Sequence, residues 1–267
     1  MNIHLSQIRN YITKHLFLTV VLILVLLIAV PYLLGFRIGP GLKLERVGTL
    51  DLVNVPAQAS IIIDQNFTRT TKKPGDATYE LMNGSHSVIV SVPGDYPWSA
   101  LTPISSHNTF KVTPLLISEH PNITPLSGTE KDTATNIIAS STLPSRTSPL
   151  LLANGCANVY VANNQIIAEA KNAPGCTPPP YLCDTVTSCS PTVVFSPISP
   201  LRGVARFPGR QDALVVEFND VIYAIDLDPR APQFFAPILG ATNPNMGTLP
   251  DGTIVVQNDT AMFRINL

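Results

Sequence analysis

The sequence predicts a mainly β protein that is held by one N-terminal transmembrane helix. An uncharged apolar run covers residues 16–36, and short β-branched runs between turn residues fill much of the remainder. The 267 residues are 45% hydrophobic and only 13% charged, with 25 prolines, which excludes a collagen, a coiled coil and a charged disordered tail. Since the net charge is only −1, no nucleic-acid partner is expected.

The apolar run is long enough to cross a bilayer, because about 20 apolar residues span the hydrocarbon core. A cleaved secretory signal is the alternative, but its apolar core has about 7–15 residues and precedes a cleavage site between small residues. Here the run ends in Tyr32-Leu33-Leu34-Gly35-Phe36, which offers no such site. The sequence therefore favours an uncleaved single-pass anchor over residues 16–36.

Flanking charges do not fix the orientation of this anchor. Arg9 and Lys14 precede the run, whereas Arg37, Lys43 and Arg46 follow it, which mildly opposes a cytoplasmic N-terminus. This rule weakens for long translocated domains, and the cysteines favour an oxidising compartment. We therefore expect residues 1–15 to be a short cytoplasmic tail and the later domains to be extracytoplasmic.

The four cysteines fall in one Pro-rich stretch, as Cys156, Cys176, Cys183 and Cys189. An even, clustered number favours two disulfides, for which three pairings are possible. Free buried thiols and a metal site are the alternatives. The wide gaps between the cysteines and the lack of a nearby His disfavour a metal site, so no metal or other cofactor is expected.

Residues 47–99 predict a small antiparallel β-sandwich. Residues 48–53, 59–64 and 86–92 have strand-like patterns, and Lys73-Pro74-Gly75-Asp76 and Asn83-Gly84 are turn signals. No helical periodicity competes with this pattern.

The same segment resembles the PEGA domain of bacterial surface proteins. The order is Gly-x-Leu-x-Leu, then Val-Pro-x-x-Ala-x-Ile-x-Ile-Asp, then Leu-x-x-Gly-x-His-x-Val-x-Val, and a closing Gly-Asp-Tyr. The resemblance covers about a fifth of the chain and departs at Asp64-Gln65, where the family has Asp-Gly, and at Lys73-Pro74, where it has Thr-Pro. It implies an extracytoplasmic β-module that presents or binds, in a bacterial envelope protein. The matching positions are Pro56, Ala59, Asp64, Leu81, Gly84, His86, Val88, Val90 and Tyr96.

Tyr96 and Trp98 at the end of this module are candidate ligand-contact residues. Exposed aromatic rings stack on sugars and anchor protein interfaces. The alternative is that the rings pack the end of the module against its neighbour. His86 is expected to pair locally at the start of its strand.

Residues 100–150 predict a Pro-, Ser- and Thr-rich connector, with residues 127–148 as a loop or linker and at most two helical turns at 133–139. A β-hairpin repeat then follows over residues 151–267. Its hairpins, at residues 159–168, 214–225 and 254–265, turn on Asn163-Asn164, Asn219-Asp220 and Asn258-Asp259. A spacing near 40 residues between the last two resembles propeller blades, but three repeats are too few to close a propeller. We therefore expect a module that resembles an incomplete propeller, with a simple stack of hairpins as the alternative.

The sequence shows no catalytic motif, and its sparse carboxylates, such as Asp220, Asp226 and Asp228, are interpreted as turn and strand-end residues. We therefore expect no catalytic or cofactor-binding residues and no enzymatic activity. The favoured function is a membrane-anchored envelope protein that binds cell-wall glycan or a protein partner through its β-modules. The alternative is a structural or sensor subunit of a larger membrane assembly.

Overall fold

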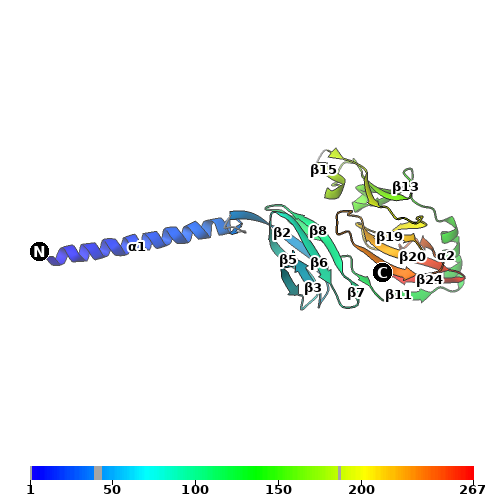
Figure 1. Ribbon diagram of the computed structural model, residues 1–267, viewed down its shortest axis with the longest axis horizontal. Helices are drawn as coiled ribbons and strands as arrows, with labels where there is room; N and C mark the ends of the chain where they lie inside the picture. Colours follow the sequence, from blue (N-terminus) through cyan, green and yellow to red (C-terminus); the bar gives the residue numbers. More distant parts are fainter. Residues whose placement is uncertain (1, 39–43, 186–187) are drawn as a thin grey trace. The chain divides into compact units, whose positions relative to one another are not determined.

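The computed structural model describes residues 2–38, 44–185 and 188–267 (Figure 1). It confirms a mainly β chain with one N-terminal apolar helix and several small sheets. The chain forms two compact units. Unit 1 comprises Met1–Val53, Asp76–His86 and Thr102–Val112, and unit 2 comprises Asn54–Gly75, Ser87–Leu101 and Thr113–Leu267.

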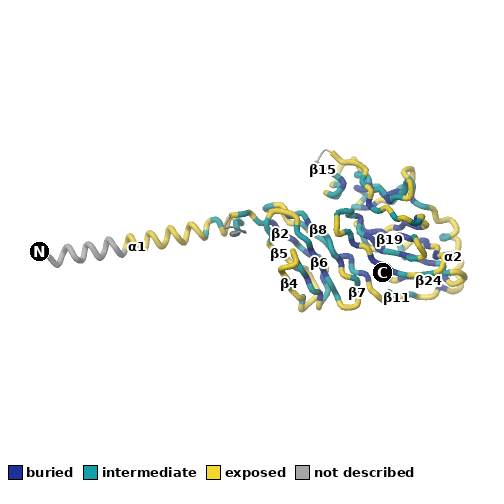
Figure 2. The backbone as a smooth tube through the Cα atoms, in the orientation of Figure 1, coloured by how far each residue is buried: buried dark blue, intermediate teal, exposed yellow. Residues whose placement is uncertain are grey.

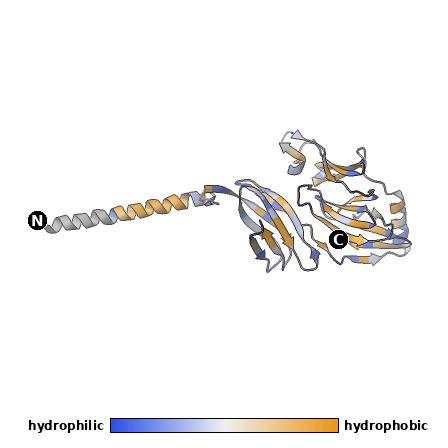
Figure 3. Cartoon of the chain, viewed as in Figure 1, coloured by the Kyte–Doolittle hydropathy of each residue, from blue (hydrophilic) through white to orange (hydrophobic). Residues whose placement is uncertain are grey.

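Helix α1, Asn2–Leu33, contains most of the apolar run predicted over residues 16–36, but it ends three residues earlier, and Phe36 already begins strand β1. Its segment His15–Leu33 is long and apolar enough to cross a membrane, and none of it is buried in the protein (Figures 2 and 3). Such a helix is unfavourable in water, because removing one aliphatic side chain from water stabilises it by about 1.5–3 kcal/mol, and none of these side chains is buried. The described residues therefore carry one helix that fits a membrane anchor.

Unit 1 joins this helix to a four-stranded sheet in the order β1-β2-β5, with β9 also pairing β2. Strand β1 pairs antiparallel with β2, whereas β9 pairs with β2 in the parallel direction. The parallel pair was not predicted, because parallel partners are distant in sequence and leave no local turn signal. The strands are β1 (Phe36–Ile38), β2 (Leu44–Val55), β5 (Gly75–Met82) and β9 (Thr109–Val112).

A second four-stranded sheet has the order β4-β3-β6-β8. The Asn83-Gly84 turn leads from β5 into β6, but these strands belong to different sheets, so it forms a corner between sheets instead of a hairpin. Gly84 has a φ of 147°, a backbone conformation that favours glycine. The strands are β3 (Ser60–Ile63), β4 (Phe67–Thr70), β6 (Gly84–Ser91) and β8 (Trp98–Ile104).

Residues 100–150 contain more regular structure than the connector prediction implied. The 13-residue helix α2, Gly128–Ser140, lies where a loop with at most two helical turns was expected. Its buried Ala134 packs in a cluster with the nearby Leu126 and with Val255 and Met262, which are far away in sequence. Tertiary packing therefore stabilises a helix whose own composition is weakly helical. The short strands are β7 (Asp95–Tyr96), β10 (Ile117–Ser118) and β11 (Asn122–Pro125).

The predicted hairpin repeat is confirmed as three four-stranded antiparallel sheets within the described part of unit 2. The first is β12-β13-β14-β17 and the second is β18-β19-β20-β21. The third is β11-β24-β23-β22, in which β11 comes from before the repeat and pairs with the last strand of the chain. Bounds are β12 (Leu150–Leu152), β13 (Ala157–Ala162), β14 (Gln165–Ala170), β17 (Thr192–Phe195), β18 (Gly203–Arg206), β19 (Ala213–Phe218), β20 (Val221–Asp226), β21 (Phe235–Gly240), β22 (Asn245–Thr248), β23 (Ile254–Asn258) and β24 (Ala261–Asn266).

Two of the three predicted turns lie where the sequence placed them. Asn163-Asn164 and Asn219-Asp220 adopt positive φ angles between 50° and 60°. The third turn is shifted by one residue, because Asn258 still pairs with Ala261 across the hairpin. The Asn258 side chain instead accepts a hydrogen bond from the Thr242 amide at 3.1 Å.

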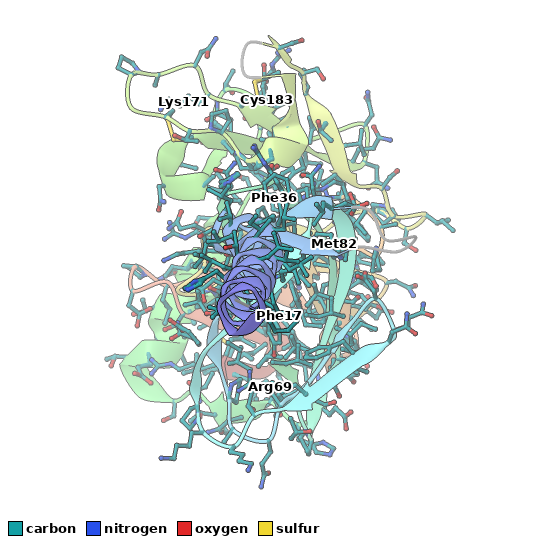
Figure 4. All side chains as sticks on the ribbon, turned by 90° about the vertical axis from the view of Figure 1, so that its left-hand side faces the viewer. Phe17, Phe36, Arg69, Met82, Lys171 and Cys183 are labelled. Atoms are coloured by element: carbon teal, nitrogen blue, oxygen red, sulfur yellow. A yellow bond between two sulfur atoms is a disulfide. The ribbon has the colours of Figure 1, made fainter. Side chains whose placement is uncertain are left out.

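The long β14–β17 connection holds three of the four cysteines, Cys156 lies just before β13, and the four form two disulfides. Cys156 pairs with Cys176, and Cys183 pairs with Cys189 across the short strands β15 (Cys183–Thr185) and β16 (Ser188–Cys189) (Figure 4). Buried residues of the first two sheets form one continuous core: Leu152, Ala157, Val159, Ile166, Ala168, Leu182, Val194, Leu201, Val204, Leu214, Val216, Ile225 and Leu227.

Candidate functional site

The candidate binding site is a depression of about 540 Å³ that is lined by one edge strand from each of the three sheets. Strands β12, β18 and β22 and the C-terminal end of α2 all contribute to its wall. Lining residues include Ser141, Thr142, Leu151, Arg206 and Thr248. Because these residues come from positions more than 100 apart, the site depends on the repeat being assembled.

Small residues allow the surrounding elements to approach closely. A Cβ atom at Gly247 would lie 3.0 Å from Ile137 and 3.1 Å from Ile138 of α2. A Cβ atom at Gly203 would lie 2.7 Å from the Met246 side chain. Packing therefore requires glycine at both positions. A methyl group at Gly247 would push α2 away from β22, and one at Gly203 would push β18 away from β22.

The depression is polar and carries an exposed cation. Arg206 is exposed, and no carboxylate lies within ion-pair distance of it in the part of the chain that the structure describes. Ser141 donates its hydroxyl to the Met246 carbonyl at 3.3 Å. Asp251 at the rim has its pKa held below the usual range by hydrogen bonds from Thr253, so it is a carboxylate at neutral pH. Hydroxyls together with one charge of each sign suit a polar, hydrogen-bonding ligand.

A second polar region surrounds Trp98. The Trp98 ring is 1% exposed, and its indole N–H donates to the Asp226 carboxylate at 2.9 Å. Burial raises the pKa of Asp226 to about 7, against the lowering effect of the indole hydrogen bond. Asp226 was interpreted from the sequence only as a strand-end residue, and its indole partner lies 128 residues away. No local signal could have identified this pair.

Arg210 lies beside this pair and binds a different segment. Its guanidinium donates to Asp212 at 2.8 and 2.9 Å and to the carbonyl oxygens of Thr113 and Pro114 at 2.6 and 3.1 Å. A cleft of about 440 Å³ next to it is also lined by Tyr181. Burial, and then nearby carboxylates, raise the pKa of the Tyr181 phenol, which stays neutral. Within unit 2, the hydrogen bonds of Arg210 to Thr113 and Pro114 and of Trp98 to Asp226 thus connect the segments that precede residue 115 to the hairpin repeat.

The structure places the two predicted aromatic contact residues differently. Trp98 is buried, which favours the packing alternative for this ring, whereas Tyr96 is only partly buried on β7. The four cysteines are all in disulfides. His86 contacts the Met82 carbonyl at 2.8 Å, a local partner as expected from the sequence. No group of three His, Cys, Asp or Glu residues that could hold a metal ion occurs among the described residues.

An aromatic cluster in unit 2 was not recognised from the sequence. Phe195, Phe218, Tyr223 and Phe235 come from four strands, and the Tyr223 and Phe235 ring centroids are 4.4 Å apart. Phe235 is 43% exposed. Three of the rings lie together in the second sheet, and Phe195 joins them from β17 of the first sheet, so the complete cluster depends on the packing of the two sheets.

Comparison with known proteins gives little further information. No protein-family model matches the chain, and no curated protein matches it. A solved DUF3823 family protein from Bacteroides ovatus is 10% identical, with a TM-score of 0.21 over 82% of this chain and 95% of that chain. A protein of unknown function from Bacteroides fragilis, described only provisionally as membrane-associated, is 12% identical, with a TM-score of 0.22 over 83% and 98%. These scores are too low to carry an argument about fold or function.

Proposed function

We propose that this protein is a membrane-anchored, extracytoplasmic envelope protein without enzymatic activity. In this proposal its β-modules bind cell-wall glycan or a protein partner. The observation that carries it is the exposed apolar helix α1 in a chain whose four cysteines are all oxidised. The helix accounts for the anchor, and the disulfides are typical of domains outside the reducing cytosol.

The depression lined by Arg206 is the binding site in this proposal. Its hydroxyls and single exposed cation fit the hydroxyls and carboxylates of a wall glycan or an acidic peptide segment. Tyr96 remains a candidate contact residue on a different element of unit 2.

We also propose that residues 47–99 are a PEGA-like module. The order of the strands along the sequence and the residues matching the family support this, although no family model matches the chain. In such a protein the module presents or binds from the outer face of the membrane.

Topology is tested first, on the full-length chain in native membranes. We expect the protein to remain in the pellet after alkaline carbonate washing and to show no thiol that reacts with a maleimide before reduction. A soluble form that begins near residue 36 would contradict the anchor, and quantitative labelling of the four cysteines would contradict the extracytoplasmic orientation.

Binding is tested with the full-length chain in detergent and purified cell-wall sacculi. Arg206→Gln should weaken co-sedimentation by roughly five-fold or more, as expected when a charge-assisted hydrogen bond is lost. Arg69→Gln is the matched control, because Arg69 is also exposed but lies on β4 outside the depression. Equal binding by wild type and Arg206→Gln would exclude the depression as the glycan site. A stable co-purifying membrane protein without glycan binding would favour the alternative, a structural or sensor subunit.

A further inference from the structure

The end of helix α1 is connected to the first sheet without a free linker. Helix α1 ends at Leu33 and strand β1 begins at Phe36. The Val47 amide on β2 donates to the Gly35 carbonyl at 3.1 Å, so pairing between β1 and β2 continues to the end of the helix. The hairpin formed by β1 and β2 therefore lies immediately beside the boundary of the apolar segment.

One face of this hairpin is occupied by an internal ion pair. Arg37 donates to Glu80 of β5 at 2.6 Å and to the carbonyl oxygens of Tyr32 and Phe36 at 3.1 Å each. Its guanidinium also lies 3.9 Å from the centre of the Tyr32 ring. Glu45 is directly opposite Arg37 in the strand register, so it belongs to this same face. The positive charge of Arg37 is thus neutralised within the protein by Glu80.

The other face presents two apolar residues and one cation without a carboxylate. Arg46 is directly opposite Phe36 in the register, and its guanidinium lies 5.0 Å from the centre of the Phe36 ring. Leu44, two residues earlier on the same face, is 58% exposed. Among the described residues, no carboxylate lies within ion-pair distance of the exposed Arg46.

We infer that this face, formed by Phe36, Leu44 and Arg46, lies in the headgroup layer of the membrane, where Arg46 binds the phosphate of an anionic phospholipid. The inference rests on the membrane anchor of the proposed function. Exposed apolar surface continues from the helix, where Leu33 is 82% exposed, to Leu44 of the hairpin. The headgroup layer adds about 5–7 Å on each side of the hydrocarbon core, and two strand residues cover roughly that distance.

Charge decides which lipid fits best. Since Glu80 neutralises Arg37, Arg46 is, among the described residues of the hairpin, the positive charge left for a ligand on this face. An anionic lipid brings one net negative charge, whereas a zwitterionic lipid brings its own ammonium group. An arginine guanidinium also suits a phosphate, because it donates two parallel hydrogen bonds and stacks on an aromatic ring such as Phe36. Phe36 is labelled in Figure 4.

The depth of the β1–β2 hairpin in the membrane is measured on the full-length oxidised chain in vesicles. An environment-sensitive fluorophore is attached at Leu44→Cys, and headgroup-labelled quencher lipids report its depth. The control is Lys111→Cys, which is exposed on β9 opposite Asp51, five residues further along β2 than Arg46. We expect at least two-fold stronger quenching at Leu44 than at Lys111. Equal quenching at the two positions would overturn the placement of the hairpin.

Lipid choice is measured by titrating the detergent-purified full-length chain with phosphatidylglycerol or phosphatidylcholine and counting bound lipids by native mass spectrometry. Arg46→Gln should weaken phosphatidylglycerol binding about five-fold, with little change for phosphatidylcholine. Lys111→Gln is the matched control and should bind like wild type. Unchanged phosphatidylglycerol binding by Arg46→Gln would overturn the site, whereas loss of the protein from carbonate-washed membranes would overturn the anchor itself.

Discussion

Asp226 and Glu217 are two carboxylates on the same face of the second sheet of the repeat, and they are satisfied in different ways. Asp226 on β20 accepts a hydrogen bond from the Trp98 indole. Glu217 on β19 is 1% exposed; one of its oxygens accepts from the Met246 amide at 3.0 Å, and the other has no hydrogen-bond partner. Burial raises the pKa of each to about 7.

The difference shows how the second sheet is joined to two other strands, to β8 at its Asp226 end and to β22 at its Glu217 end. At the Asp226 end, a side chain from β8 supplies a large buried ring and a complete hydrogen bond. At the Glu217 end, the Met246 side chain of β22 packs against Gly203, and the Met246 amide satisfies only half of the carboxylate. A buried polar atom without a partner costs about 1–3 kcal/mol. The Asp226 end should therefore be the stronger junction, and the Glu217 end the one that a conservative substitution can improve.

Removing the Trp98 ring should have the largest effect. Trp98→Ala should lower the free energy of unfolding by about 3–5 kcal/mol, because it leaves a large cavity and removes the hydrogen bond to Asp226. Urea denaturation of the full-length chain in detergent, followed by circular dichroism, measures this change. Asp226→Asn keeps an acceptor for the indole and should cost much less. A Trp98→Ala protein that unfolds like wild type would show that the ring does not hold this junction.

The disulfides should come next and should act independently of both carboxylates. In the loop-entropy view, the 20-residue separation of Cys156 and Cys176 corresponds to roughly 3 kcal/mol, and the 6-residue separation of Cys183 and Cys189 to roughly 2 kcal/mol. The paired Cys→Ser variants, measured in the same urea assay, should follow this order. The reverse order would mean that native-state packing, and not loop length, sets their contribution.

Stability should also depend on pH through the two carboxylates. Because their folded pKa values lie near 7, above those of an unfolded chain, the folded state binds more protons between about pH 4 and 7. Stability should therefore fall as the pH rises from 5 to 8, by about 2–3 kcal/mol for each carboxylate. Emission of Trp98, the only tryptophan, should change over the same range. The double variant Glu217→Gln/Asp226→Asn should flatten the stability profile; an unchanged slope would contradict the assignment to these groups.

Neutralising Glu217 should have the smallest effect. Glu217→Gln keeps an acceptor for the Met246 amide and removes the buried charge, so at pH 8 it should raise the free energy of unfolding by about 2 kcal/mol. At pH 5, where the wild-type carboxyl is protonated, the difference should nearly disappear. A variant that is destabilised at both pH values would indicate that the carboxyl has a partner the amide cannot replace.

Several features followed from local sequence. The apolar helix α1 followed from an uncharged run, and two hairpin turns followed from Asn163-Asn164 and Asn219-Asp220, whose side chains tolerate a left-handed backbone. The strands around residues 59–64 and 86–92 followed from alternating β-branched residues. These signals are local, because helix length, turn geometry and strand alternation are properties of neighbouring residues.

Tertiary structure decided the remaining features. The parallel pairing of β9 with β2, the completion of the third sheet by β11, and helix α2 over residues 128–140 all depend on partners far away in sequence. The same holds for the indole–carboxylate pair of Trp98 and Asp226 and for the depression around Arg206. Burial and long-range contact set their energies, so the sequence by itself determined the apolar helix and the hairpins, whereas their assembly determined the candidate site.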